Sequence, residues 1–150
     1  MELFVDDAGF VRAPAWLTYR RLANVAAWPV WWRGARVRAM PSAADGDAWA
    51  LELAGARLRR LRLAIRPHDW RRDIGFVLDV TGNVAGRAEF WLEDAYGGTV
   101  VHHVLAGRSA GDHRRGSWIL EDYRRAIRRG LWGLKDALQL EARTSAGLDP

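Results

Sequence analysis

The sequence predicts an α+β domain in which a seven-stranded antiparallel sheet packs against one long C-terminal helix. Three observations support this fold class. Apolar and polar residues alternate with period two from about Ala35 to Arg108, and turn-forming residues interrupt the alternation at five places. A further strand and two short helical segments precede this region, and apolar residues at three- and four-residue steps follow it. The length of 150 residues suits one such domain.

The chain opens with a strand predicted over Leu3 to Arg12. Pro14 follows it, and proline suits the first turn of a helix. The spacing of apolar residues from Trp16 to Leu22 predicts a short helix, and a second short apolar segment ends in residues 28–34. The first 34 residues therefore contribute one strand and two short helices.

The central segment is predicted to form six strands in a meander. The turn-forming residues are Asp45-Gly46-Asp47, Gly55, Pro67-His68-Asp69, Gly82-Asn83 and Gly97-Gly98. The alternation places one set of apolar residues on a common face, among them Leu61, Leu63, Ile65, Ile74, Phe76, Leu78, Val80, Ala88, Phe90 and Leu92. Arginines and glutamates occupy the other face, so one face is apolar and the other is charged.

The last helix is predicted to begin at Ser117 as N-cap and to end near residue 142. Its apolar positions are Ile119, Tyr123, Ile127, Leu131, Leu134 and Leu138. A helix of about 26 residues spans roughly 39 Å, and seven strands make a sheet roughly 29 Å wide. One helix cannot cover the whole apolar face, so other side chains must fill the remainder or a cavity is left. We expect a single domain over residues 1–142 and a flexible tail over residues 143–150.

Composition excludes several classes of site. The hydrophobic content of 49% and the charged content of 27% are those of a folded globular chain. The chain has no cysteine, and therefore no disulfide, no thiolate nucleophile and no sulfur-ligated metal. The histidines lack metal-ligand spacing, and no phosphate-binding or dinucleotide-binding glycine motif occurs, so we predict neither metal nor cofactor. The acidic first residues and the short, proline-broken apolar stretch Val25 to Trp32 predict a cytoplasmic protein without a transmembrane segment.

The basic residues are twenty-two arginines and one lysine, a ratio typical of GC-rich coding. Between Arg57 and Arg72 lie seven arginines and one acidic residue, Asp69. The net charge of this segment, seven positive charges less one negative charge, exceeds the net charge of +5 of the whole chain. Two interpretations remain open: a solvated charged face, or a surface for an acidic partner such as nucleic acid, acidic lipid headgroups or an acidic carrier protein. The predicted strand shows no interleaved exposed aromatic residues, which argues against nucleic acid.

The order of elements and several short motifs are similar to those of one superfamily. The motifs are Phe10-Val11-Arg12-Ala13-Pro14, Ala27-Trp28-Pro29-Val30-Trp31-Trp32, Gly82 to Leu92, Gly97-Gly98-Thr99 and Arg129-Gly130-Leu131-Trp132-Gly133-Leu134. Over residues 3–142 the chain resembles the START-like helix-grip (SRPBCC) superfamily, and within it the polyketide cyclase/dehydrase branch. The resemblance implies a curved sheet that grips the last helix, with a deep and mostly apolar pocket between them.

This resemblance, combined with the alternation, identifies candidate site residues. The residues expected to contact a hydrophobic ligand are Trp28, Trp32, Trp49, Leu51, Leu63, Phe76, Leu78, Phe90, His103, Tyr123 and Ile127. Trp28 and Trp32 are expected at the mouth or base of the pocket. The aromatase/cyclases of this branch tend to carry an arginine inside the pocket on the strand that corresponds to Leu58 to Arg66. That arginine is missing here if Leu61, Leu63 and Ile65 point inward as the alternation predicts.

His103 is the candidate catalytic residue, since the alternation places it on the apolar face and His102 on the other. An imidazole there, with Tyr123, could transfer a proton in a ring closure or dehydration. The alternative is a core histidine hydrogen-bonded to a helix residue such as Tyr123. Three functions therefore remain open: binding of a polyketide-like molecule with cyclisation or dehydration, a non-catalytic carrier or sensor of a lipid or quinone, and an interaction module that uses the arginine face on RNA, the ribosome or a membrane.

Overall fold

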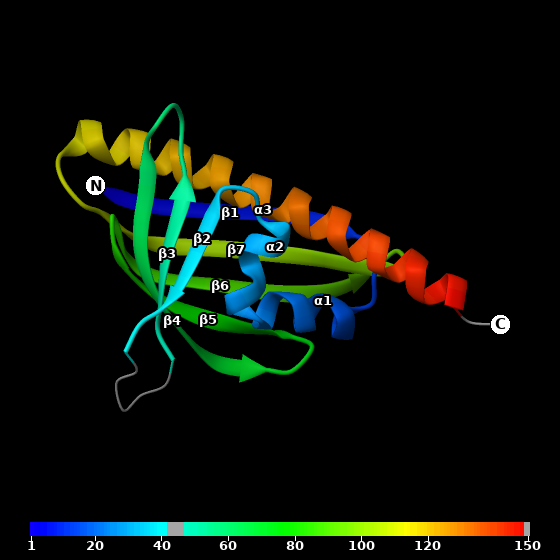
Figure 1. The fold of residues 1–150 in the computed structure, drawn as a ribbon. Coiled ribbons are helices and arrows are strands. Elements are labelled where there is room, and N and C mark those ends of the chain that lie inside the picture. Colours follow the sequence, from blue (N-terminus) through cyan, green and yellow to red (C-terminus); the bar gives the residue numbers. More distant parts are fainter. Residues whose placement is uncertain (42–46, 149–150) are drawn as a thin grey trace.

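The computed structural model describes residues 1–41 and 47–148, with side chains described up to residue 144. The elements in chain order are β1 (Glu2–Val11), α1 (Ala15–Ala23), η1 (Val25–Ala27, a 3₁₀ turn), α2 (Trp28–Trp31), β2 (Ala35–Ala39), β3 (Trp49–Ala54), β4 (Arg60–Arg71), β5 (Gly75–Gly82), β6 (Val84–Ala95), β7 (Gly98–Ser109) and α3 (His113–Leu148). The seven strands form one antiparallel sheet in the order β1-β7-β6-β5-β4-β3-β2. Figure 1 shows this sheet curving around α1 and α2, with α3 lying along the side of β1. The predicted fold class is confirmed.

The predicted division of the sheet into two faces is also confirmed. Leu61, Leu63 and Ile65 of β4 are buried, whereas Arg60 and Arg62 are exposed. The inward residues of the other strands meet α3 and the short helices in one core, whose members include Leu3, Val5, Leu51, Leu53, Phe76, Leu78, Val80, Ala88, Phe90, Val101, Leu105, Ile119, Ile127, Leu134 and Leu138. A one-residue slip of β4, which would bring its arginines into the core, does not occur.

The last helix differs from the prediction at both ends. It begins at His113, where the Asp112 carboxylate accepts a hydrogen bond from the backbone N–H of Arg115 at 2.9 Å and so provides the N-cap. Ser117 lies inside the first turns, and its hydroxyl donates to the carbonyl of His113. The helix continues to Leu148, beyond the boundary placed at residue 142. No helix in the described ranges is long and apolar enough to cross a membrane.

The predicted turn at Pro67-His68-Asp69 is wrong. β4 continues to Arg71, and its register with β5 shifts between His68 and Arg71, where Asp69 has a φ of 52°. The chain reverses after this bulge, with the backbone N–H of Ile74 donating to the carbonyl of Arg71. Ile74 therefore lies in the turn with 52% of its surface exposed, and not on the inner face. The turn predicted at Asp45-Gly46 lies outside the described residues.

Candidate functional site

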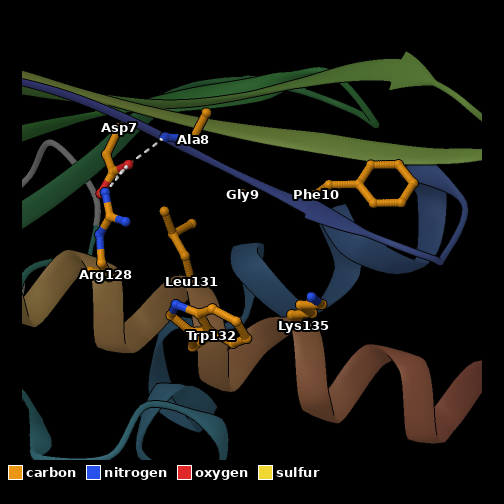
Figure 2. A pocket seen from close by; sticks show the side chains of 8 residues that line it. All are labelled: Asp7, Ala8, Gly9, Phe10, Arg128, Leu131, Trp132 and Lys135. Atoms are coloured by element: carbon orange, nitrogen blue, oxygen red, sulfur yellow. Dashed lines mark hydrogen bonds and ion pairs between the residues drawn. The ribbon is translucent and has the colours of Figure 1, made fainter.

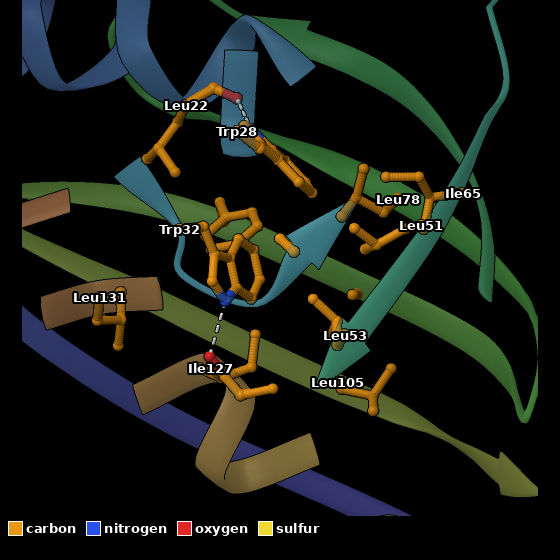
Figure 3. Close-up of a cluster of buried hydrophobic side chains, with 14 of the residues drawn as sticks. Leu22, Trp28, Trp32, Leu51, Leu53, Ile65, Leu78, Leu105, Ile127 and Leu131 are labelled. Carbon is orange, nitrogen blue, oxygen red and sulfur yellow. Dashed lines mark hydrogen bonds between the residues drawn. The ribbon is translucent and has the colours of Figure 1, made fainter. Parts of the chain in front are cut away.

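Three tryptophans of the second helical segment occupy the space that the sequence leaves open between sheet and last helix. Trp28 is only 1% exposed, and its ring centroid lies 5.5 Å from that of Trp32 and 6.0 Å from that of Phe90. Trp31 stacks on Trp32 at 5.7 Å. Two indole N–H groups are satisfied: Trp28 donates to the carbonyl of Leu22 at 2.9 Å, and Trp32 donates to that of Ala126 at 3.0 Å (Figure 3). We call Trp28, Trp31 and Trp32 the tryptophan plug.

Two glycines of α3 allow the plug to approach the helix. A Cβ atom at Gly130 would lie 2.6 Å from the Trp32 ring, and one at Gly133 would collide with the carbonyl oxygen of Trp31. The void that the described residues leave beside the plug measures about 10 Å³, which is the space of about one water molecule. The predicted deep pocket is therefore filled in this structure, and Trp28 and Trp32 form part of the filling.

The other predicted ligand-binding residues fall into two groups. Most of them are packed in the core around the plug, namely Leu51, Leu63, Phe76, Leu78, Phe90, His103, Tyr123 and Ile127. Trp49 at the start of β3 is instead half-buried and lines a hollow that is open to solvent. A ligand in the first group would require the plug to move, whereas a ligand at Trp49 would not.

His103 and Tyr123 form a buried pair between β7 and α3. His103 Nε2 lies 2.7 Å from the Tyr123 hydroxyl, and the His103 ring lies 4.4 Å from that of Phe90. Burial lowers the pKa of His103 to about 3 and raises the pKa of Tyr123 above its ordinary value of about 10. His103 is thus neutral at physiological pH, and within the described part of the chain its Nδ1 has no hydrogen-bond partner. This geometry corresponds to the alternative interpretation of His103, a core histidine hydrogen-bonded to Tyr123.

The pair predicts a specific acid sensitivity. Because the pKa of His103 is lower in the folded state than the ordinary value of about 6.5, the unfolded chain binds an additional proton between about pH 6.5 and 3. We expect the free energy of unfolding to fall as pH falls through this window. In the double variant His103→Phe/Tyr123→Phe both polar partners are replaced by apolar groups of similar shape, which costs little stability. Urea unfolding at several pH values should show a shallower decline for the double variant, and equal declines would contradict the assignment.

The hollow beside Trp49 lies at the open end of the sheet, between η1 and the end of β4. Its volume is about 460 Å³, and its lining consists of Ala23, Asn24, Val25, Ala26, Asp47, Trp49, Pro67, His68, Asp69 and Trp70. We call it the open-end hollow. A second hollow of about 430 Å³ shares Ala23 and Asn24 with it and is lined further by Trp16, Tyr19, Arg20, Arg72 and Asp73. Four aromatic side chains thus face solvent-filled space around the junction of α1 and η1.

Trp70 owes its position to the bulge in β4. In a regular strand, the alternation that buries Pro67 would point Trp70 to the outer face. The bulge at Asp69 adds a residue and turns Trp70 inward, so that its ring lies 4.7 Å from that of the buried Phe76. Trp70 remains 48% exposed and forms the outer end of a row of aromatic contacts that continues through Phe76 and Phe90. Trp70 is not among the predicted site residues, because the residues of this bulge are typical of a turn.

Polar groups lie at one side of the open-end hollow. His68 Nε2 lies 3.0 Å from Asp79 Oδ1, and its Nδ1 lies 3.5 Å from Asp69 Oδ2. The hydrogen bond to Asp79 raises the pKa of His68 above its ordinary value, and Asp69 contributes in the same direction. The lining of the open-end hollow therefore includes the indole rings of Trp49 and Trp70 and a histidine, His68, that lies between two carboxylates.

A smaller groove lies between β1 and α3 (Figure 2). Its volume is about 190 Å³, with Phe10 and Trp132 among its walls. Arg128 at its edge is paired with Asp7 at 3.1 Å, and the ammonium group of Lys135 lies 4.8 Å from the Trp132 ring. Because its arginine is already paired and its volume is less than half that of the open-end hollow, we regard it as the weaker candidate.

The fold is similar to those of several solved proteins. The Zhui aromatase/cyclase from Streptomyces sp. R1128 matches with a TM-score of 0.73 and 15% identity, over 97% of this chain and 98% of that one. The protein TTHA0849 from Thermus thermophilus matches with a TM-score of 0.75 and 12% identity, over 93% and 99%. The di-domain ARO/CYC BexL from the BE-7585A biosynthetic pathway matches with a TM-score of 0.70 and 12% identity, over 92% of this chain and 50% of that one. No protein-family model and no curated protein sequence matches the chain.

Proposed function

We infer that the protein binds a planar, largely apolar small molecule as a carrier or sensor. Two features support this inference: the START-like helix-grip (SRPBCC) fold of the chain and its open-end hollow. The observation that carries this proposal is the hollow of about 460 Å³ with indole walls, since small-molecule sites usually enclose about 300–1,000 Å³. The interior His103–Tyr123 pair takes no part in it.

The lining indicates the chemical class of the ligand. Trp49 and Trp70 supply two aromatic faces, on which a planar ring system can stack. Asn24 and Asp69 supply hydrogen-bonding groups beside them: the amide of Asn24 can donate to a carbonyl oxygen, and the carboxylate of Asp69 can accept from a hydroxyl group at the edge of such a ring. A polyketide-like aromatic or a quinone combines both features, whereas a saturated acyl chain has no planar face for the indoles.

Replacement of Trp70 tests this site. We expect Trp70→Ala to weaken binding of the planar probe anilinonaphthalene sulfonate about tenfold, because a stacked aromatic contact is lost from a pocket wall. The fold should persist, since Trp70 is about half exposed. Probe fluorescence titration measures the change.

Trp132→Ala is the matched control, because Trp132 is also a half-exposed tryptophan but lies at the smaller groove on α3. It should leave the affinity for the probe unchanged. Equal affinity of wild type and Trp70→Ala, or a loss in Trp132→Ala alone, would move the ligand away from the open-end hollow.

Cyclisation or dehydration is the second candidate function. The observation that favours it is the buried His103–Tyr123 pair, in which Nδ1 has no partner among the described residues. The Zhui and BexL proteins are named as aromatase/cyclases and share the fold. Chemistry at this pair would require the surrounding core to open, because both side chains are buried and the void beside the neighbouring tryptophan plug measures only about 10 Å³.

A linear poly-β-ketone that cyclises spontaneously distinguishes the two functions. If the protein is a carrier, wild type and His103→Phe/Tyr123→Phe will give the same rate and the same distribution of cyclised products. A faster or redirected cyclisation with wild type that disappears in the double variant would establish catalysis at the pair. Chromatography of the products over time measures both quantities.

A further inference from the structure

The turn between β3 and β4 projects an apolar side chain from a basic surface. Leu58 at the tip of this turn is 98% exposed. Arg57 precedes it, and Arg60 follows at the start of β4, on the outer face of the sheet. An isolated exposed leucine needs no explanation, but one held at a convex tip between cations has the composition of a membrane-contacting loop.

The turn is held in place by contacts with α3. Asp122, which is fully buried, accepts two hydrogen bonds from the Arg59 guanidinium at 2.9 and 3.0 Å and one from the backbone N–H of Ala56 at 3.1 Å. Within the turn, the N–H of Gly55 donates to the carbonyl of Arg59. The exposure of Leu58 is therefore the result of a fixed geometry, in which Arg59 points to the helix and the neighbouring arginines do not.

Arg57 adopts a backbone conformation that favours glycine, with a φ of 58°. A non-glycine residue is strained in this region relative to glycine. The Arg57 side chain nevertheless stands at the tip of the turn, and within the described part of the chain it makes no hydrogen bond or ion pair.

Strand pairing extends the basic surface beyond the segment that the sequence analysis singled out. Arg36 of β2 pairs with Glu52 of β3, which in turn pairs with Arg62 of β4, so the three side chains form one row across the outer face. This row lies two residues, or about 7 Å, from Arg60. That distance is within the Debye length of about 8 Å at physiological ionic strength. Among the described residues, four arginines, at positions 36, 57, 60 and 62, therefore act against one glutamate near the tip, Glu52, whose carboxylate lies 3.8 Å from the exposed Arg62 guanidinium.

Other acidic groups near the tip are already engaged. Asp122 is bound by Arg59, and Glu121 is paired with Arg125 at 2.8 Å. The outward positions of β3 on either side of Glu52 are Ala50 and Ala54, which carry small side chains, so the described part of this face places no aromatic ring there for base stacking. These features favour a bilayer over a single-stranded nucleic acid.

We propose that the β3–β4 turn docks this protein on anionic phospholipid bilayers, with Leu58 inserted at the headgroup level and Arg36, Arg57, Arg60 and Arg62 contacting the acidic headgroups. Such docking brings the protein to the lipid bilayer, where a planar apolar molecule accumulates. The proposal does not depend on the open-end hollow, because the turn and the hollow share no residue.

Sedimentation with vesicles tests the docking. We expect wild type to bind vesicles made of equal parts phosphatidylserine and phosphatidylcholine, to lose binding as salt is added, and to ignore phosphatidylcholine alone. Leu58→Ser should weaken the partition coefficient about tenfold through the loss of its apolar side chain. Arg57→Gly should weaken it about fivefold while leaving the melting temperature unchanged or raising it, because glycine relieves the positive φ.

Tyr96→Ser is the matched control. Tyr96 is 96% exposed in the β6–β7 turn and also has a positive φ, of 52°, but its neighbours in the chain include Glu93 and Asp94. It should bind vesicles like wild type, and so should Trp70→Ala, which separates docking from ligand binding. Absence of binding to the anionic vesicles at low salt, or wild-type binding by both Leu58→Ser and Arg57→Gly, would overturn the proposal. Capture of duplex RNA in preference to the vesicles would also overturn it.

Discussion

Replacing Trp28 with alanine is expected to lower the free energy of unfolding by about 3–5 kcal/mol. Trp28 is 1% exposed, contacts Trp31, Trp32 and Phe90, and donates its indole N–H to the carbonyl of Leu22. The void beside the plug is only about 10 Å³, so the surrounding side chains have little freedom to close the space that the indole leaves. Urea unfolding followed by circular dichroism measures the loss.

The same variant should acquire an apolar cavity that binds indole. A dry cavity of this kind accepts small aromatic molecules, and a ligand that binds only the folded state stabilises it in proportion to the logarithm of its concentration. We therefore expect indole to raise the melting temperature of Trp28→Ala more than that of wild type, because only the variant has the new cavity in addition to the open-end hollow. Trp16→Ala provides the control, since Trp16 lies on α1 with 53% of its surface exposed and its removal leaves no enclosed space. A Trp28→Ala protein as stable as Trp16→Ala, or one that indole does not stabilise, would contradict the role of the plug.

The tryptophan plug illustrates which features of the interior could be predicted from the sequence and which could not. Periodicity gave the correct inward face for β4 and for His103 of β7, because that information is local and repeats every two residues. Periodicity did not predict how much space remains between the sheet and the helices. Whether Trp28 and Trp32 line that space or fill it depends on how closely α2 approaches α3. That approach depends on Gly130 and Gly133, about one hundred residues away in the chain, whose missing side chains admit the indoles.

The errors in the sequence analysis have local causes. Pro67, His68 and Asp69 are typical turn residues, yet here they occupy the end of β4 and a bulge that re-aims Trp70. Ser117 is a favourable N-cap residue, but Asp112 fills that role one turn earlier. In both cases two positions were chemically suitable, and residue type alone does not select between them. The open-end hollow escaped prediction because the bulge turns Trp70 toward it, although one of its walls, Trp49, was identified.

The contact between Asp122 and the β3–β4 turn could not be inferred from the sequence either, because its partners lie more than sixty residues apart. We expect Asp122→Ala to lower the free energy of unfolding by about 3 kcal/mol, since it leaves the Arg59 guanidinium and the Ala56 N–H without their acceptor. Gly55 allows this contact, because a Cβ atom there would collide with the Asp122 carboxylate. Glu121→Ala is the control: its exposed pair with Arg125 should contribute less than about 1 kcal/mol.

The pH dependence of this loss separates the charged interaction from simple packing. Burial opposes ionisation of Asp122, but the hydrogen bonds from Arg59 and Ala56 together with the positive charges of Arg59 and Arg125 outweigh it, so the pKa of Asp122 lies below its ordinary value. A carboxyl group with a lowered folded-state pKa stabilises the protein fully above its unfolded-state pKa of about 4, and this contribution disappears as pH falls through the folded-state value. The stability difference between wild type and Asp122→Asn should therefore be constant near neutral pH and shrink below about pH 4. His103, whose effect begins near pH 6.5, is present in both proteins and cancels from the difference. A difference that did not change with pH would show that Asp122 holds the turn by shape and not by charge.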